Sequence, residues 1–287
     1  MSLGTSASIA LVGAGRRMGM YAPILKKLLE KSSAQVVAIY NRTPSKAQEL
    51  ADLFNVSIFD SYQKMLSLEN IDAVVIAVSH EVKSHYAKLA LEKGVSVFLE
   101  TPLSQSTKEA QDLVELANQN NCRLEVCENQ TFAPIALFQK QLLETKDFGE
   151  PINIINQFNE FEYHALARLH YLIGLDTSAM SYSHNRHDFK NKNQSIEISE
   201  IIFNNEISFK HLYCTPKKLS LRITKNWVIE CKNAIISEEG IHETLAPWKK
   251  TPFTVSHKGI ELSYNGRQYR WDYPFVASDW NESTWGI

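Results

Sequence analysis

Short apolar runs alternate with segments of helical periodicity through the first 125 residues of the chain. Six of these runs have the length and the β-branched content of strands, at 9–12, 36–40, 56–59, 73–78, 95–99 and 124–127. Most are continuous rather than alternating, which is typical of strands that are buried on both faces. Because strands separated by helices pair in parallel, we expect an α/β fold whose first domain, 1–125, is a doubly wound parallel sheet.

The pattern changes after Asn129, where strands and helices no longer alternate. We expect one helix from Tyr163 to about Leu175, followed by several strands joined by polar turns. The strand-like runs lie at 196–203, 207–214, 219–224, 228–236 and 260–264. A second domain, 126–287, is therefore predicted as α+β, with a mostly antiparallel open sheet.

Composition excludes several classes of partner. Across 287 residues the formal net charge is −2, with no block of like charge, so neither nucleic acid nor a membrane surface is an expected partner. The four cysteines form no CxxC pair, which favours a reducing compartment. With no apolar run long enough to span a bilayer and no secretory pattern at the N-terminus, we expect a cytoplasmic protein.

A glycine motif lies between the first predicted strand and the first predicted helix. It reads Gly13-Ala14-Gly15-Arg16-Arg17-Met18-Gly19, and in this context glycines permit a tight turn while the helix N-terminus attracts a pyrophosphate. The third glycine comes one place late, with Met18 in the fingerprint position. We interpret residues 1–125 as a dinucleotide-binding Rossmann domain; the alternative is a tight turn without a ligand.

The end of the second strand indicates which dinucleotide is bound. Sites for NAD usually place an acid there, whereas this chain reads Asn41-Arg42-Thr43. Arg42 can pair with a 2′-phosphate and Asn41 and Thr43 can donate hydrogen bonds, so NADP(H) is favoured over NAD(H). Arg16 and Arg17 add positive charge, although any of these arginines could simply face water.

Further motifs resemble the glucose-fructose oxidoreductase, inositol dehydrogenase and MocA family over about the first 175 residues. They are the glycine turn, Ala77-Val78-Ser79-His80, Leu91-Glu92-Lys93-Gly94, Glu100-Thr101-Pro102-Leu103, Asn129-Gln130-Thr131-Phe132-Ala133-Pro134 and Phe148-Gly149-Glu150-Pro151-Ile152. The resemblance implies hydride transfer between a nicotinamide and a small carbonyl compound, sugar or polyol at the junction of the domains. It also implies a homodimer or homotetramer assembled through the C-terminal sheet.

By matching position, the resemblance places the cofactor against Ala77, Val78, Ser79 and His80, and the nicotinamide beside Glu100, Thr101 and Asn129. Family members that oxidise sugars have a lysine where this chain has Thr101. On a later helix, His170 is aligned with a histidine that faces the substrate in family members. Leu166 and Ile173 are aligned with positions where family members have acidic residues. The lysine-assisted oxidation of sugars is therefore not expected.

Biliverdin reductases, which resemble the chain more loosely, also lack that lysine. The chain ends before the long C-terminal helix of most members, so it is a short member or a truncated one.

Hydride transfer also needs a group that supplies a proton. His170 is the first candidate because imidazole titrates near neutral pH, and the alternative is a packed core histidine. Thr101 could position a carbonyl, and Glu128 is a further catalytic candidate. Tyr163, His164 and Arg168 join His170 as candidate substrate contacts, and no metal site is expected.

These observations favour an NADPH-dependent reductase of a small carbonyl, imine or conjugated substrate. The alternative is a catalytically silent protein of the same fold that binds the dinucleotide as a signal. Loss of the family lysine and of the helix acids favours the sensor, whereas retention of Glu100, Pro102 and a substrate-side histidine favours the enzyme.

Overall fold

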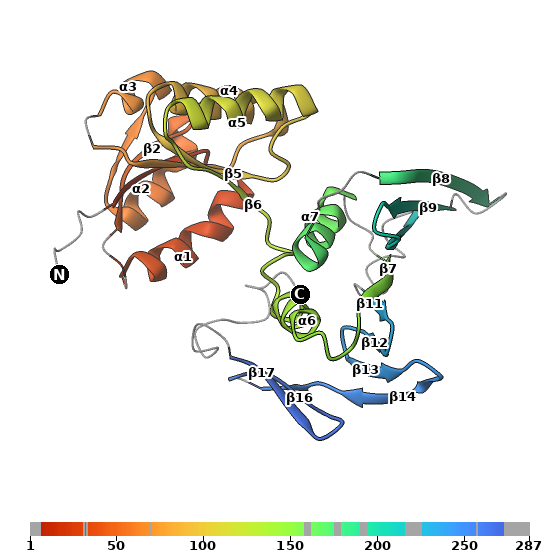
Figure 1. Cartoon of the computed structure of the whole chain (residues 1–287). Coiled ribbons are helices and arrows are strands. Elements are labelled where there is room, and N and C mark those ends of the chain that lie inside the picture. The colour runs from red at the N-terminus through yellow and green to blue at the C-terminus, as the bar shows by residue number, and fades with distance from the viewer. Residues whose placement is uncertain are drawn as a thin grey trace. The chain divides into compact units, whose positions relative to one another are not determined.

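The computed structural model describes residues 7–30, 32, 34–68, 70–157, 162–174, 179–189, 194–215, 226–256 and 258–272. The chain divides into two compact units, Met1–Cys127 and Glu128–Ile287 (Figure 1). The division lies two residues beyond the boundary expected from the sequence, at the end of the sixth strand. Each unit has its own sheet and its own buried apolar core.

The N-terminal unit is built on a six-stranded parallel sheet with the strand order β3-β2-β1-β4-β5-β6. Its strands are β1 (Ala7–Val12), β2 (Ala34–Tyr40), β3 (Ser57–Phe59), β4 (Ala73–Ile76), β5 (Ser96–Glu100) and β6 (Leu124–Cys127). Each strand overlaps one of the six apolar runs, and all neighbours pair in parallel. The predicted doubly wound sheet is confirmed.

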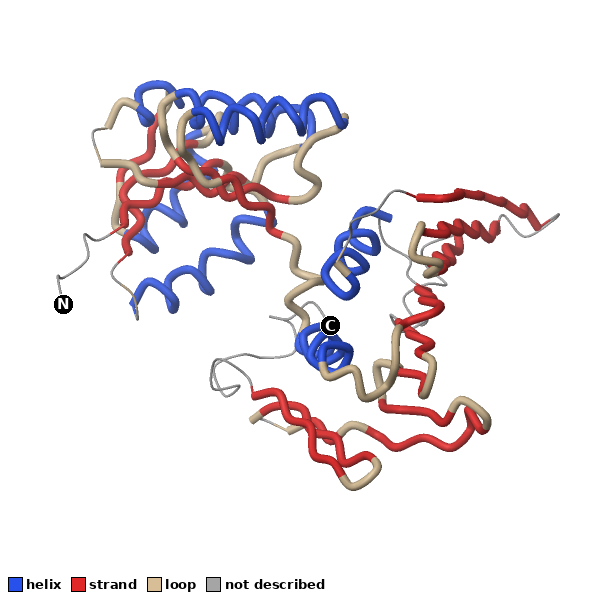
Figure 2. The backbone as a smooth tube through the Cα atoms, viewed as in Figure 1, coloured by secondary structure: helices blue, strands red, loops and turns tan. Residues whose placement is uncertain are grey.

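Helices cover both faces of this sheet (Figure 2). They are α1 (Arg16–Glu30), η1 (Pro44–Ala47), α2 (Gln48–Phe54), α3 (Tyr62–Leu66), α4 (His80–Glu92) and α5 (Thr107–Gln119). Met18 and Ala22 of α1 pack with Leu11 and Ile39 in one apolar cluster. A second cluster on the other face includes Ala87 of α4 and the apolar residues of α3 and α5.

The C-terminal unit contains an eight-stranded sheet with the order β14-β13-β12-β11-β7-β10-β9-β8. Its strands are β7 (Pro151–Gln157), β8 (Ala179–Phe189), β9 (Gln194–Phe203), β10 (Ser208–Thr215), β11 (Asn226–Cys231), β12 (Ala234–Ile236), β13 (Gly240–Glu243) and β14 (Ala246–Pro252). A separate three-stranded sheet follows, formed by β15 (Thr254–Val255), β16 (Gly259–Tyr264) and β17 (Arg267–Asp272). All neighbours pair antiparallel except β7 and β10, so the mostly antiparallel sheet is confirmed.

Two helices belong to this unit, α6 (Pro134–Glu144) and α7 (Glu162–Ile173). The predicted helix from Tyr163 corresponds to α7. The elements that match none of the predicted runs are α6 and the strands β7, β8, β13, β14, β15 and β17. The run at 228–236 forms two strands, β11 and β12, instead of one. The predicted strand 219–224 lies outside the described residues.

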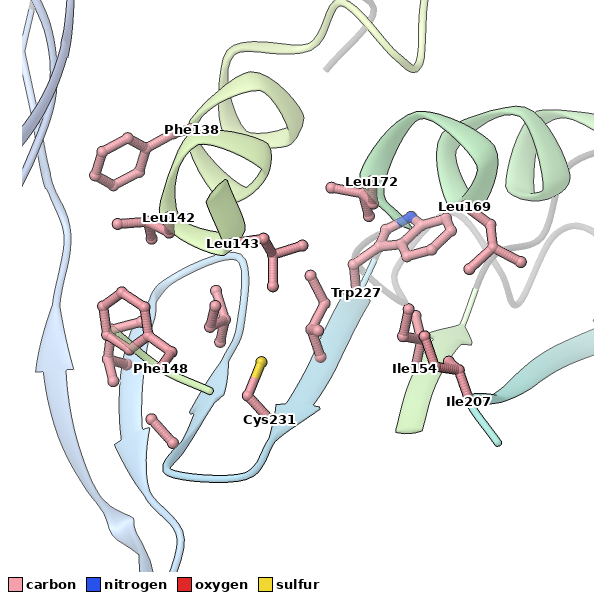
Figure 3. Packing of buried hydrophobic residues seen from close by; sticks show 14 of the residues in the cluster. Phe138, Leu142, Leu143, Phe148, Ile154, Leu169, Leu172, Ile207, Trp227 and Cys231 are labelled. Carbon is pink, nitrogen blue, oxygen red and sulfur yellow. The ribbon is translucent and has the colours of Figure 1, made fainter. Parts of the chain in front are cut away.

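The core of the C-terminal unit is formed where α6 and α7 pack against the sheet (Figure 3). Phe138 and Leu142 of α6, Leu169 of α7, and Ile154 and Ile229 of the sheet are fully buried. On α7 the residues Ala165, Leu169 and Leu172 recur at helical spacing and turn one stripe of the helix toward this core. Leu166 lies outside the stripe and is 41% exposed.

This difference predicts unequal effects for two leucines of α7. Leu169→Ala should lower the free energy of unfolding by about 2–5 kcal/mol, because it removes buried methyl groups and leaves a cavity. Leu166→Ala should change it by less than about 0.5 kcal/mol, as expected for an exposed position. All five tryptophans follow Glu128 in the sequence, so tryptophan fluorescence during urea unfolding reports on the C-terminal unit. Equal losses in both variants would contradict the placement of α7.

Candidate functional site

The glycine turn joins the end of β1 to the start of α1 at the carboxyl edge of the parallel sheet. Gly13 has a φ of +99°, a conformation that favours glycine, and its N–H donates to Tyr40 O at 2.9 Å. A Cβ on Gly13 would lie 2.5 Å from Ala77 O and 2.8 Å from Val78 Cγ1. The turn therefore packs against the ends of both β2 and β4, which no larger residue would permit.

Gly15 and Met18 have different surroundings. Gly15 is exposed, and a Cβ there would meet no protein atom within 4 Å, so its backbone is open to a ligand. Met18 is fully buried in the cluster with Leu11 and Ile39. Its side chain takes the place where a third glycine would allow close packing of helix and strand, which leaves only its backbone for the predicted cofactor contact.

The loop after β2 is fixed to the glycine turn by one side chain. Asn41 Oδ1 accepts a hydrogen bond from Ala14 N at 3.0 Å, and Asn41 Nδ2 donates to Thr43 O at 2.7 Å. Arg42 and Thr43 are exposed beside this connection, as are Arg16 and Arg17 at the start of α1. The loop thus presents a guanidinium and no carboxylate at Asn41-Arg42-Thr43.

The segment Ala77–His80 follows β4 at the same edge. Ala77 is buried and its N–H donates to Val12 O at 2.9 Å, while Ser79 and His80 are exposed at the N-terminus of α4. Together with the turn at Gly13, these residues surround the point between β1 and β4 where the strand order reverses. Open α/β sheets bind their ligands at such a switch point.

Glu100, the last residue of β5, is the centre of a polar cluster. Its side chain is 11% exposed, and Oε1 lies 3.0 Å from Arg17 Nε and accepts a hydrogen bond from the Tyr21 hydroxyl. Oε2 accepts from Thr101 N at 2.9 Å and from Thr101 Oγ1 at 3.3 Å. The hydroxyl predicted to position a carbonyl is therefore bonded to Glu100, and that role of Thr101 stays a prediction.

Lys83 is a member of this cluster that the sequence interpretation missed. It is fully buried on α4, and Nζ donates to Glu100 O at 2.9 Å. Burial lowers the pKa of Lys83 to about 8, against the opposing effect of the Glu100 carboxylate. The signal was present, because Lys83 lies four residues before Ala87 and seven before Ala90, both fully buried on the apolar stripe of α4.

In the C-terminal unit, Glu128 and His164 form a buried pair. His164 Nδ1 lies 2.7 Å from Glu128 Oε2, and each side chain is about one-tenth exposed. Glu128 Oε1 accepts a hydrogen bond from Gln130 N at 2.9 Å, and the Tyr163 ring lies 4.4 Å from the His164 ring, centroid to centroid. A carboxylate that is itself held in place thus orients the imidazole.

The other two candidates on α7 have opposite surroundings. Arg168 is 2% exposed, and its guanidinium pairs with Glu238 at 3.0 Å, donates to Gln139 at 2.8 Å and lies over the Trp227 ring. Its surroundings therefore give no support to the predicted substrate contact. His170 is exposed, and its position two residues later turns it to the far side of the helix from Arg168.

The remaining predicted residue, Asn129, is exposed just after the end of β6, in the C-terminal unit. Within the described ranges, no group of three or more His, Cys, Asp and Glu side chains could hold a metal ion. Burial raises the pKa of Cys127 to about 12, so its thiol is not a ready nucleophile. Among the helices described, none is both long and apolar enough to cross a bilayer.

Comparison with known sequences supports the interpretation of the N-terminal unit. Residues 7–128 match the oxidoreductase family with an NAD-binding Rossmann fold. The chain is 28% identical over 141 residues to an uncharacterized oxidoreductase of Schizosaccharomyces pombe, covering 48% of this chain and 38% of that protein. It is 31% identical over 101 residues to a scyllo-inositol 2-dehydrogenase (NADP(+)) of Bacillus subtilis, covering 35% and 31%. The match thus spans less than half of each relative.

Solved structures share the fold over a larger part of the chain. One is a biliverdin reductase from Synechocystis, determined with biliverdin and NADP+. The two structures match with a TM-score of 0.65 at 16% identity, over 93% of this chain and 85% of the reductase chain. A dehydrogenase from Chromobacterium violaceum matches with a TM-score of 0.72 at 17% identity, over 98% of this chain and 84% of the dehydrogenase chain. At this identity the likeness shows the fold alone. The sequence match and the shared fold agree: residues 7–128 are similar to the NAD-binding Rossmann domain of the GFO/IDH/MocA oxidoreductase family.

Proposed function

We propose that this chain is an NADPH-dependent reductase of a small carbonyl, imine or conjugated substrate. The family and the fold support the coarser statement, an NAD(P)-dependent oxidoreductase. The observation that supports a preference for NADPH is the loop after β2. There Asn41 fixes the glycine turn, and the exposed Arg42 has no acidic residue beside it in Asn41-Arg42-Thr43. A guanidinium there favours a 2′-phosphate, whereas the carboxylate of an NAD site would repel it.

The residues present fit a dinucleotide. Gly13 brings the turn close to the sheet and Gly15 leaves open space above its backbone. Helix α1 begins directly afterwards, and the first N–H groups of a helix, which have no intrahelical partner, suit a pyrophosphate. When bound, the nicotinamide supplies the hydride, and the protein's part is to hold and orient it. Ala77–His80 and Glu100 line the same carboxyl edge of the sheet.

His164 is the residue we propose to hold the transferred proton. With a proton on Nδ1 the ring donates to Glu128 and leaves Nε2 to exchange a proton, and Glu128 stabilises the cation that forms when both nitrogens are protonated. His170 has the same chemistry but is exposed, and the structure describes no carboxylate that orients it. The Glu128–His164 pair therefore carries the assignment, and His170 stays the competing candidate.

A catalytically silent sensor is the second candidate function. One observation favours it: the Thr101 hydroxyl donates a hydrogen bond to Glu100. Thr101 is the residue that the resemblance aligns with the family's lysine, so its hydroxyl is already engaged. A sensor needs the same cofactor residues but no oriented proton donor. The Glu128–His164 pair is unexplained in that case, so we prefer the reductase.

Titration of the purified chain with NADPH, followed by assays of NADPH oxidation, tests the proposal. We expect nicotinamide fluorescence to report binding, and absorbance at the nicotinamide band to fall when ketones, imines, sugars or bilins are added. Binding without oxidation by any of these classes would favour the sensor. The absence of binding would contradict both functions.

Arg42→Ala should weaken NADPH binding by about tenfold to a hundredfold and leave NADH binding nearly unchanged, because a charge-assisted contact to the 2′-phosphate contributes about 1.5–3 kcal/mol. Lys46→Ala is the matched control, since Lys46 is an exposed cation on the adjoining η1. Isothermal titration of both variants with both cofactors makes the comparison. Equal weakening of NADPH and NADH in Arg42→Ala would remove the argument for NADP.

His164→Asn should lower turnover at saturating NADPH by about a hundredfold or more, the usual effect of losing a general acid, with NADPH affinity retained. His170→Asn is the control on the same helix and should keep turnover within about twofold. Steady-state kinetics, with tryptophan fluorescence as a check of folding, distinguishes the two histidines. A large loss in His170→Asn alone would return the role to His170.

A further inference from the structure

Lys83 is the most unusual charged residue of the N-terminal unit. Lysine is almost never fully buried, because its ammonium group is strongly hydrated and its long stem normally carries that group to water. Here the whole residue is shielded on α4, and Nζ is turned to the backbone oxygen of Glu100, 2.9 Å away. Fold stability alone gives no reason for such a residue, since an apolar side chain on this stripe would pack without the loss of hydration.

Groups from four other elements face this ammonium, directly or through Glu100. Glu100 of β5, Cys127 of β6 and Glu109 of α5 interact with Lys83. Arg17 and Tyr21 of α1 reach the Glu100 carboxylate from its other side. The Cys127 thiol is neutral, Glu109 is half-buried in the first turn of α5, and the Arg17 side chain is 49% exposed. The buried charges are thus one anion, Glu100, and one cation, Lys83.

The cluster lies on one half of the sheet. Glu100 and Cys127 end β5 and β6, whereas the glycine turn and Asn41 adjoin β1 and β2. A doubly wound sheet of this order binds one mononucleotide over each half, with the pyrophosphate at the glycine turn between them. If Arg42 holds the adenosine side, as proposed above, the nicotinamide side belongs to β4, β5 and β6, and so to the Glu100 cluster.

We propose that Lys83 is a positioning residue that shifts the preference of this site toward the reduced nicotinamide and away from the oxidised one. The oxidised ring carries a positive charge and the reduced ring carries none. The Lys83 ammonium offsets the attraction that the Glu100 carboxylate exerts on the cationic ring, and it leaves the neutral ring unaffected. The inference rests on the proposed cofactor binding, and the preference suits a protein that takes up NADPH and releases NADP+.

A pH dependence follows from the burial of this ammonium. Because burial lowers the pKa of Lys83 to about 8, the lysine is charged at pH 7 and mostly neutral at pH 9. Loss of its proton leaves the buried Glu100 carboxylate with only the half-exposed Arg17 as a neighbouring cation, so the carboxylate attracts the cationic ring more strongly. The affinity for NADP+ should then rise relative to NADPH as the pH passes through about 8. The 2′-phosphate is common to both forms, so its own titration cancels in the ratio.

The experiment measures the ratio of the dissociation constants of NADP+ and NADPH at pH 7 and pH 9, by nicotinamide fluorescence and competition. For the unaltered chain we expect this ratio to fall from pH 7 to pH 9 by on the order of threefold to tenfold. This is the effect expected when one charge near the nicotinamide ring is lost and solvent partly screens it. Lys83→Met should show the low ratio at both pH values. Lys83→Arg should keep the high ratio at both, because a guanidinium does not titrate in this range.

Lys88→Met is the matched control, since Lys88 is on the same helix with a side chain that is 62% exposed, and it should behave like the unaltered chain. If Lys83→Met weakens both cofactors equally and the ratio does not move, Lys83 is only structural and the inference is wrong. If Lys83→Met does not fold, a ratio that is flat with pH in the unaltered chain overturns it equally. If the unaltered chain binds neither cofactor, the proposed function itself has failed.

Discussion

The N-terminal unit depends on one close approach, between the backbone of Gly13 and the carbonyl group of Ala77. Because Gly13 has no side chain, the chain can leave β1, turn with a positive φ and start α1 while it touches the ends of β2 and β4. The turn therefore lies at the place where the strand order reverses. Without this contact the open backbone at Gly15, the loop at Asn41 and the segment Ala77–His80 would not meet at one edge.

A second constraint is the buried carboxylate of Glu100. An isolated carboxylate in such a position would be costly, and here hydrogen bonds from Tyr21 and Thr101 and the charge of Arg17 compensate it. Glu100 also engages the hydroxyl of Thr101, the residue that the family resemblance aligns with a lysine. Positive charge is therefore retained near this carboxylate, but it comes from Arg17 and from the buried Lys83.

How much could be predicted from the sequence depended on whether the physical signal was local. Continuous apolar runs such as Ala73–Ile76 predicted the parallel strands because burial on both faces leaves a pattern within four or five residues. Strand β8 could not be found in this way, since it lies at the edge of its sheet and its residues are exposed throughout. The glycine turn was predictable from spacing, whereas the burial of Met18 was visible only in three dimensions.

Side-chain partners were the least predictable part. Glu128 and His164 are 36 residues apart, and no spacing in the chain announces their contact. Helical periodicity predicts that His170 is exposed, because it falls four residues after the exposed Leu166 and outside the buried stripe of Ala165, Leu169 and Leu172. Its catalytic role stays a prediction.

The Glu128–His164 pair favours the proposed reductase over the sensor more strongly than the lysine argument favours the sensor. A protein that only senses a dinucleotide needs its glycine turn and its phosphate contacts, and nothing in that task calls for an imidazole held by a carboxylate. Burying His164 and Glu128 together removes two polar groups from water, and the gains described are their mutual hydrogen bond, the hydrogen bond from Gln130 N and the contact of the Tyr163 ring. Such an arrangement contributes little to the stability of the fold, so stability alone gives no reason for it, whereas the proposed proton transfer does.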